Sequence, residues 1–392
     1  MPVRKVVIDR ANRLYQMPPE VTEFASERTG KVFARRAETI DLGRFLWPIT
    51  FETDQVPDVD GLSPATRADL AGLMEELADW YSKRCGVRLV KEKEIHIGGR
   101  LSSLIYQLCL AFVDSGDVAF VPAVGVPIYR SAVMACDGEP IGYEISAKSD
   151  WSPRFDRLST GLGRVARLLF VNSPHNPTGS ELSAKEISEL IWLAGRENVL
   201  VINDAAYAGL AARTPASLLG DAGGKRVGVE LGAFSYMFGL PALPFGFAIG
   251  NREVIAGLKR VARLQPPYIP RFYVRLAVDA IRKYPTDQLQ GLRDRITRAS
   301  AEATQLLDML DLERTGPGAV PYVWARIDKR TPSTYIAKTL LRRHRLLVAP
   351  GLGFGENGEG HLRFSTLTGP GSFVEATQRI KKSRTLRRRE ES

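Results

Sequence analysis

Short apolar runs alternate with amphipathic stretches through the first two thirds of the chain. Residues 95–97 (IHI), a run that starts at Val118, and residues 165–172 (VARLLFVN) are rich in β-branched and aromatic side chains, which is typical of buried strands. Residues 100–112 and 184–197 carry apolar positions at helical spacing. Strands that alternate with helices of this length predict a mainly parallel sheet with helices on both faces.

The pattern changes after about residue 270. A long helical stretch at 272–310 leads into short apolar runs and another helical stretch at 336–343, which is the order expected of a smaller α+β domain. We therefore expect an N-terminal arm with part of the small domain at 1–50, a large domain at 51–270, a small C-terminal domain at 271–380 and a basic tail at 381–392.

The composition excludes several classes of protein. The chain has 392 residues, of which 44% are hydrophobic and 25% charged, as in globular proteins of two domains. Part of its net charge of +10 lies in the tail KKSRTLRRREES, which we interpret as a solvated end, since no nucleic-acid-binding motif accompanies it. No signal-peptide core and no apolar run of about 18 residues is found, so we expect no membrane partner. Three cysteines without paired spacing indicate reduced thiols in a cytoplasmic protein, and we expect no metal site.

A glycine pair joins the predicted strand at 95–97 to the next helix. Gly98 and Gly99 come directly before Arg100, where the helix is expected to begin. A strand, a glycine turn and a helix start place free backbone N–H groups and the positive end of the helix at one point, which favours an anion. The same two glycines would also serve in a tight turn without a ligand, and the sequence leaves both interpretations open.

A series of motifs follows in order along roughly residues 40–377. They are LADWYSKRCGVRL, the glycine turn, SGDVAFVP, NSPHNPTG, NDAAY, ELGAFSYMFGLPALPFGFAIG, VAPGLGFGENGEG and HLRF. Their order and spacing resemble the class I/II aminotransferases of fold type I, especially the branch with alanine and LL-diaminopimelate aminotransferases. The resemblance implies a three-layer α/β large domain with a mainly parallel sheet, the fold of pyridoxal-phosphate (PLP) dependent transferases, beside a smaller α+β domain.

The resemblance also implies cofactor-binding roles in the NPTG and NDAAY motifs. Asn176 and Tyr207 match the residues that hydrogen-bond the ring oxygen of PLP. Asp204 matches the aspartate that pairs with the pyridine nitrogen and keeps it protonated, which makes the ring an electron sink. Without a cofactor, Asn176 would be a turn-forming residue and Asp204 a polar residue that closes a buried strand.

The remaining implied contacts concern phosphate and substrate. Gly99, Arg100 and Ser235 lie where the family holds the cofactor phosphate. Arg363, in HLRF, matches the arginine that binds the substrate carboxylate with two parallel hydrogen bonds, and Asn176 is expected beside it. The implied ligand is therefore small and resembles an amino acid.

The segment that anchors the cofactor in the family departs from its pattern at two positions. Tyr236 stands where the family has the Schiff-base lysine, and Pro244 stands where it has a phosphate-binding arginine, while the flanking residues fit without a gap. Tyrosine cannot form an imine, and proline has neither a side-chain donor nor a backbone N–H. A third difference is Val126 at the position of the ring-stacking aromatic, for which Tyr129 is the alternative.

These departures predict that ordinary transamination is absent or very weak, because the lysine also moves the proton between substrate and cofactor. The first interpretation is an enzyme that acts on a small amino-acid- or keto-acid-like substrate without an internal aldimine. It would be independent of PLP, or would hold PLP or pyridoxamine phosphate (PMP) non-covalently, as do some sugar dehydratases that resemble this family and carry histidine at the lysine position. Tyr236 would then act as acid, base or oxyanion donor if its pKa were lowered.

Two other interpretations stay open, so the sequence does not decide whether the protein is an enzyme. The family habit of homodimers allows a non-catalytic partner or ligand sensor, as a homodimer or as a heterodimer with an active paralogue. The third interpretation is a transaminase that uses an unexpected lysine, although neither Lys225 nor Lys259 lies at the right place in the sequence.

The environment of Tyr236 is expected to separate the first two interpretations. Polar groups that converge on Tyr236 would favour chemistry. A pocket filled by Phe234, Met237 or Phe245 would favour a partner or scaffold, as would a Tyr236 packed against Asp204 or Asn176 in the space of the cofactor.

Overall fold

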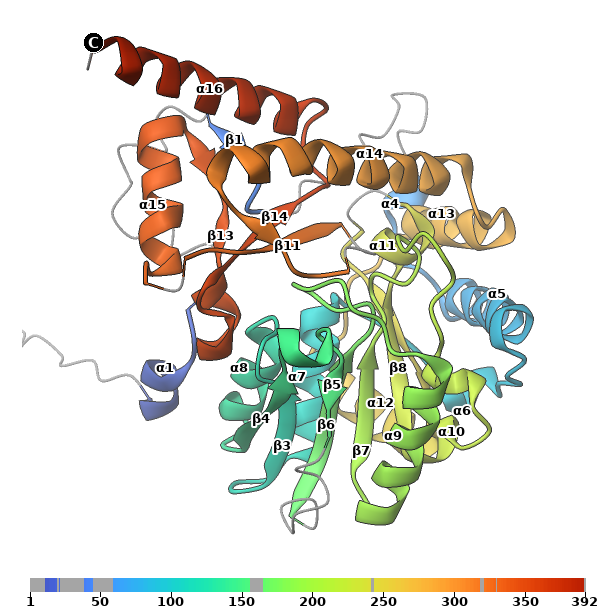
Figure 1. Ribbon diagram of the computed structural model, residues 1–392. Coiled ribbons are helices and arrows are strands. Elements are labelled where there is room, and N and C mark those ends of the chain that lie inside the picture. The colour runs from blue at the N-terminus through green and yellow to red at the C-terminus, as the bar shows by residue number, and fades with distance from the viewer. Residues whose placement is uncertain are drawn as a thin grey trace, which may run out of the picture.

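A computed structural model describes residues 11–19, 21, 39–44, 59–155, 165–240, 243–317, 321–328 and 330–390. Most of the predicted N-terminal arm lies outside these residues. Within them, a large sheet is flanked by helices, and a smaller sheet with its own helices lies beside it (Figure 1). The predicted α/β fold, with a large mainly parallel sheet and a smaller α+β part, is confirmed.

The large sheet has eight strands in the order β2-β9-β8-β7-β6-β3-β4-β5. The central pairs β8–β7, β7–β6, β6–β3 and β3–β4 are parallel, whereas β9 runs antiparallel to both β2 and β8, and β5 runs antiparallel to β4. The strands span β2 Ile95–Gly98, β3 Val118–Pro122, β4 Glu139–Ile145, β5 Pro153–Arg154, β6 Ala166–Asn172, β7 Leu200–Asp204, β8 Gly228–Ala233 and β9 Gly246–Gly250.

Two neighbouring parallel strands end on polar residues that begin the site. The registers of β6 and β7 place Asn172 beside Asp204 at the carboxyl ends of the strands. Residues 168–171 of β6 and residues 200–202 of β7 are apolar, so Asn172 and Asp204 lie at the edge of a largely apolar core. Ligands of open α/β sheets bind beyond this edge.

Helices cover both faces of the large sheet and begin where the sequence places capping residues. Thr66 caps α5 and Ser183 caps α9, each in a capping box with an acidic residue three positions later. The helices around this sheet span α5 Arg67–Cys85, α6 Lys91–Glu94, α7 Leu101–Phe112, α8 Ile128–Ala135, α9 Ala184–Glu197, α10 Gly224–Val227, α11 Phe234–Phe238, α12 Arg252–Ala262 and α13 Arg271–Arg282.

The helical stretch expected at 272–310 is two helices, α13 and α14 (Asp287–Leu310). Pro285 lies between them and cannot continue a helix, because it lacks a backbone N–H. Helix α13 buries Val274, Ala277 and Ile281 in one core cluster with α5, on the large sheet. Helix α14 instead leads to the smaller sheet and packs against α16 (Ser372–Glu390).

The smaller sheet carries the other half of the site. It has the strand order β10-β11-β14-β13, and the short strands β1 and β12 pair in parallel next to it. Its elements span β1 Ile40–Asp41, β10 Glu313–Arg314, β11 Tyr322–Arg326, α15 Ser333–His344, β12 Leu346–Leu347, β13 Ala349–Pro350 and β14 His361–Ser365. Helix α16 runs through residue 381, where the basic tail was expected to begin, and leads away from the body of the protein (Figure 1).

No helix in the described part of the chain has both the length and the apolar character to span a membrane. Among the same residues, no group of three or more His, Cys, Asp or Glu side chains is placed to hold a metal ion.

Candidate functional site

The carboxyl group of Asp204 is at the buried end of the site. Its Oδ2 accepts a hydrogen bond of 2.6 Å from the Tyr129 hydroxyl, and its Oδ1 accepts one of 3.0 Å from the Ala206 backbone N–H. The Tyr129 ring stacks on Phe170 with 5.3 Å between ring centroids. Tyr129, which was considered for ring stacking on the cofactor, therefore orients the Asp204 carboxylate.

Burial raises the pKa of Asp204 from 3.8 to about 6, although the hydrogen bonds from Tyr129 and Ala206 act in the opposite direction. A carboxyl pKa that rises on folding makes ionisation destabilising. This cost is absent below about pH 4 and fully present above about pH 6. Asp204→Asn does not carry this cost, because its side chain does not ionise. The difference in free energy of unfolding between Asp204→Asn and wild type should therefore grow, in favour of the variant, by up to about 3 kcal/mol from pH 4 to pH 7. Urea denaturation across this range measures the change.

A sign control is available for this pH dependence. The backbone N–H of Asp114 and the side chain of Arg167 lower the pKa of Asp117. Asp117→Asn should consequently lose stability relative to wild type as the pH rises through the lowered pKa toward about 4, and this difference should then stay constant up to pH 7. A stability difference for Asp204→Asn that does not change with pH would contradict the placement of this carboxyl group in a dry environment.

Asn176 and Tyr207, both expected at the ring oxygen of a cofactor, lie next to each other. The Asn176 Nδ2 donates a hydrogen bond of 3.2 Å to the Tyr207 hydroxyl, and the hydroxyl of Tyr322 donates one of 3.1 Å to the same oxygen. Asn176 is itself held by its backbone N–H, which donates to Asn172 Oδ1 at 2.8 Å. The amide and hydroxyl groups thus form one connected polar network above the end of β6.

Arg363 extends this network from the smaller sheet. Its Nη1 donates to Asn176 Oδ1 at 2.9 Å, and its Nη2 donates to the Gly43 carbonyl at 2.6 Å. The guanidinium carbon lies 4.3 Å from the Tyr322 ring centroid and 4.9 Å from that of Phe354. Only 7% of Arg363 is exposed, and its Nε has no hydrogen-bond partner. Burial lowers the pKa of this guanidinium from its ordinary value.

Tyr236 lies against the network through its ring. It stacks on Tyr207 with 5.3 Å between ring centroids and an interplanar angle of 27°. Burial raises the pKa of the Tyr236 phenol, and the nearby Tyr322 and Asp204 raise it further, whereas Arg100 acts in the opposite direction. A role as base required a lowered pKa, so this expectation is not met, and Tyr236 stays a protonated side chain near neutral pH.

The residues expected around a cofactor phosphate differ in whether they offer free hydrogen-bond donors. Arg100 is the N-cap residue of α7, whose first turn receives no hydrogen bond from a capping side chain, so backbone N–H groups next to Gly99 face outward from the helix end. The hydroxyl of Ser235, on α11, instead accepts a hydrogen bond of 2.8 Å from the Leu243 N–H, in the loop that precedes β9. Pro244, in the same loop, adds no donor.

The large apolar side chains beside Tyr236 do not belong to this network. Phe234, Met237 and Phe245 are buried in the core cluster with α5 and α13. These three side chains therefore do not fill the space around the polar network, whereas Tyr236 itself packs on the Tyr207 ring, so the criterion set from the sequence is met in part.

Neither lysine considered from the sequence bonds a residue of the site. Lys225 Nζ donates to the Arg88 carbonyl and to Glu94, and Lys259 Nζ donates to the Glu92 carbonyl. All three partners lie in or near α6, which precedes β2, whereas Gly99 and Arg100 follow the opposite end of that strand.

Sequence reasoning did not identify Tyr322, Phe354 and Gly43 as part of the site. Tyr322 lies on β11, whose pairing with β14 places Trp324 opposite Arg363 and Tyr322 opposite Ser365. The only signal in the sequence was the apolar run PYVWARI, which belongs with HLRF to the predicted small domain. Strand pairing is a long-range property, so motif spacing alone could not reveal these contacts.

Comparison with known proteins finds one matching family profile and relatives that cover most of the chain. The sequence profile described as aminotransferase class I and II matches residues 65–372. An LL-diaminopimelate aminotransferase of Desulforudis audaxviator is 27% identical over 389 residues, which cover 95% of this chain and 97% of that protein. One from Halothermothrix orenii is 28% identical over 311 residues, covering 78% of this chain and 79% of the relative.

Solved structures share the fold over nearly the whole chain. Substrate-bound BacF from Bacillus subtilis superposes with a TM-score of 0.87 at 24% identity, covering 96% of this chain and 98% of BacF. A probable N-succinyldiaminopimelate aminotransferase from Thermus thermophilus superposes with a TM-score of 0.82 at 25% identity, covering 93% of this chain and all of that structure.

Proposed function

The chain belongs to the class I and II family of aminotransferases, which depend on PLP, and we propose that it is a divergent enzyme of this family that acts on a small amino acid or keto acid without a Schiff-base lysine. The observation that carries the proposal is the buried guanidinium of Arg363, whose Nε has no partner. A buried cation is costly unless an anion pairs with it. A substrate carboxylate supplies that anion and fits the forked donors of arginine.

The substitution of Tyr236 for the lysine determines which chemistry is proposed. A phenol forms no imine, so the protein holds no covalent cofactor at this position. Because burial raises its pKa, the Tyr236 hydroxyl acts as a hydrogen-bond donor, and it can stabilise negative charge that develops on a bound substrate. Transamination at the rate of a lysine-containing relative is not expected.

The residues present fit the ring end of non-covalently held PLP or PMP. Asp204 would hold the ring nitrogen, and Asn176 with Tyr207 would hold the ring oxygen. The phosphate would meet the amino end of α7 at Gly99 and Arg100. When bound, the cofactor would supply a ring that withdraws electrons from the substrate α-carbon. Few side-chain donors are available to hold the phosphate, because Pro244 supplies none. An enzyme that is independent of PLP is therefore also compatible with this site.

The names of the relatives suggest the class of substrate. The two relatives described above are LL-diaminopimelate aminotransferases, which implies that they act on an amino acid with a carboxylate and an ammonium group at each end. We propose a substrate of the same broad class for this chain, in amino acid biosynthesis. The Arg363 guanidinium fits its carboxylate, whereas the identity of the side chain is left to experiment.

The first test is a titration of the purified protein with PLP and, separately, with PMP. We expect saturable binding by visible absorbance, and no lysine adduct after borohydride reduction and mass analysis, because position 236 carries no amine. An adduct on any lysine of the site would refute the proposed chemistry and revive the ordinary transaminase. If neither form binds, the PLP-independent version is the one to assay with amino and keto acids.

A non-catalytic partner is the second candidate function. The family habit and one surface support an assembly with a second chain: Leu264 and Tyr268 are 80% and 64% exposed after α12, and Leu62 beside them is 52% exposed. The Tyr268 hydroxyl donates to the Leu62 carbonyl, so Tyr268 and Leu62 lie together on one surface, and Leu264 precedes Tyr268 by four residues. We propose a homodimer through this surface, or a heterodimer with a paralogue, and a monomer by light scattering at micromolar concentration would refute it.

A further inference from the structure

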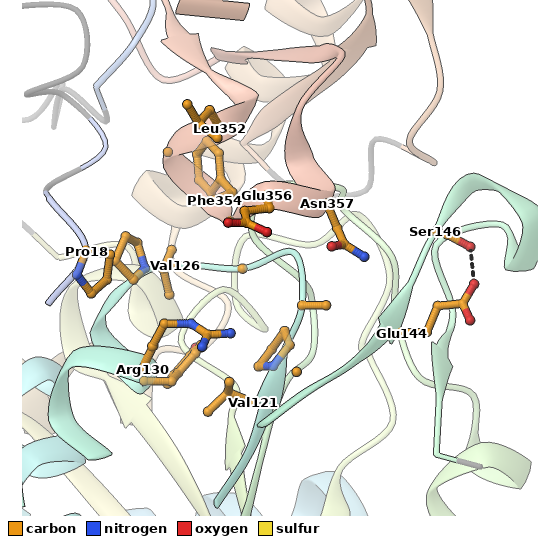
Figure 2. A pocket seen from close by; sticks show the side chains of 18 residues that line it. Pro18, Val121, Val126, Arg130, Glu144, Ser146, Leu352, Phe354, Glu356 and Asn357 are labelled. Atoms are coloured by element: carbon orange, nitrogen blue, oxygen red, sulfur yellow. Dashed lines mark hydrogen bonds between the residues drawn. The ribbon is translucent and has the colours of Figure 1, made fainter. Parts of the chain in front are cut away.

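A cavity lies next to the Arg363 site and shares two side chains with it. It has a volume of about 730 Å³ and lies between the carboxyl end of β3, strand β4 and the two 3-10 turns that precede β14 (Figure 2). Tyr129, which bonds Asp204, and Phe354, which packs on Arg363, both line it. Val126, at the position of the family's ring-stacking aromatic, lines it as well.

The inner wall of this cavity carries a half-buried cation. Arg130, on α8, donates one hydrogen bond of 3.2 Å from Nη1 to the Pro140 carbonyl. Burial lowers the pKa of the Arg130 guanidinium. Among the residues that the structure describes, no carboxylate lies within ion-pair distance of it. Its other N–H donors are therefore available to an anion in the cavity.

The mouth of the cavity carries two carboxylates. Glu356 extends from its turn into the space opposite Arg130, and its charge raises the pKa of Arg130 (Figure 2). Glu144 lies at the rim, where one of its oxygens accepts a hydrogen bond of 2.9 Å from the Ser146 hydroxyl. The Asn357 side chain adds an amide between them.

This arrangement selects one chemical class of ligand. A phosphate or other dianion would be repelled by Glu356 and Glu144, and a metal cation would be repelled by Arg130. A zwitterion complements both, with its anionic group inside and its cationic group at the mouth. The apolar side chains of Val121, Val126 and Phe354 leave room for a short aliphatic group.

We propose that this cavity is a second binding site, specific for a small α-amino acid. The carboxylate of the ligand binds Arg130, and its ammonium group faces Glu356, with Glu144 nearby. The site does not depend on the proposed reaction at Arg363, because it uses different charged residues.

The test is a titration of the full-length protein with L-alanine by calorimetry, in the presence of saturating pyruvate. Pyruvate is a carboxylate without an ammonium group, so at a concentration that saturates the Arg363 site it should compete only weakly with alanine for the cavity, where Glu356 favours a ligand with an ammonium group. We expect one alanine site, whose affinity falls at least tenfold in Arg130→Gln and at least threefold in Glu356→Gln. Acetate and methylamine, each with one half of the zwitterion, should bind at least tenfold more weakly than alanine.

The controls separate this site from the Arg363 site. Arg167→Gln, an exposed arginine at the other end of the large sheet, should leave alanine binding unchanged. Arg363→Gln should remove pyruvate binding and retain the alanine site, so failure of one site is distinguishable from failure of the other. Alanine binding that is the same in wild type, Arg130→Gln and Glu356→Gln would overturn the proposal, as would acetate binding as tight as that of alanine.

Discussion

Tyr236→Lys is expected to give the protein a borohydride-reducible adduct with PLP, at one equivalent per chain, where wild type forms none. The substituted amine would lie beside Tyr207 and near Asp204, the two residues that fit the cofactor ring. Burial lowers the pKa of a lysine, which favours the neutral amine that attacks an aldehyde. Visible absorbance and mass analysis after reduction measure the adduct, and an amino-acid half-reaction followed by absorbance would rise from undetectable by several orders of magnitude.

A matched control places the same amine on the surface. Tyr335 is 61% exposed on α15, and Tyr335→Lys should produce no more adduct than wild type under the same conditions. Adding Pro244→Arg to Tyr236→Lys should strengthen PLP binding by about 10- to 100-fold, since a charge-assisted hydrogen bond is worth about 1.5–3 kcal/mol. If Tyr236→Lys folds, by circular dichroism, and still forms no adduct at position 236, the ring-binding roles of Asp204, Asn176 and Tyr207 are wrong.

The alternation of strands and helices was predictable because it depends on local patterns. The helix at 184–197 begins and ends as the sequence indicated, since a capping Ser183 and the apolar spacing both lie within the segment. The stretch 272–310 was read as one helix because its apolar spacing continues, whereas Pro285 should have ended it. The domain boundary near residue 270 stays a prediction. Helix α13 begins just after this boundary and packs against α5, which covers the large sheet.

The position of the site was also predictable, but not the bonds within it. Motif order places Asp204, Asn176 and Arg363 together, and the structure joins the last two directly. The partner of each side chain depends on rotamers and on strands far away in the sequence. Ser235 on α11 illustrates this point, because its hydroxyl accepts a hydrogen bond from the Leu243 N–H, in the loop before β9, which motif spacing does not reveal.

The strongest constraint on function is the position of Arg363 between the two sheets. Its two terminal nitrogens are already bonded to Asn176 and to the Gly43 carbonyl, both neutral acceptors. The charge itself is therefore not neutralised by a carboxylate among the described residues, and Tyr322 and Phe354 limit its access to water. Such a cation binds a carboxylate more strongly than an exposed arginine does, because water competes less.

Arg363→Gln should therefore weaken binding of keto acids by about 100-fold or more, since two charge-assisted hydrogen bonds are lost. Calorimetry or ligand-induced changes in melting temperature, with pyruvate and 2-oxoglutarate, measure the effect. Arg363→Lys should give an intermediate loss, because it keeps the charge without the forked geometry. Arg326→Gln, at an exposed residue of β11 that pairs with Glu313, should change nothing. Equal keto-acid affinity in wild type and a folded Arg363→Gln would remove the basis of the proposed function, since no other described cation shares this contact with Asn176.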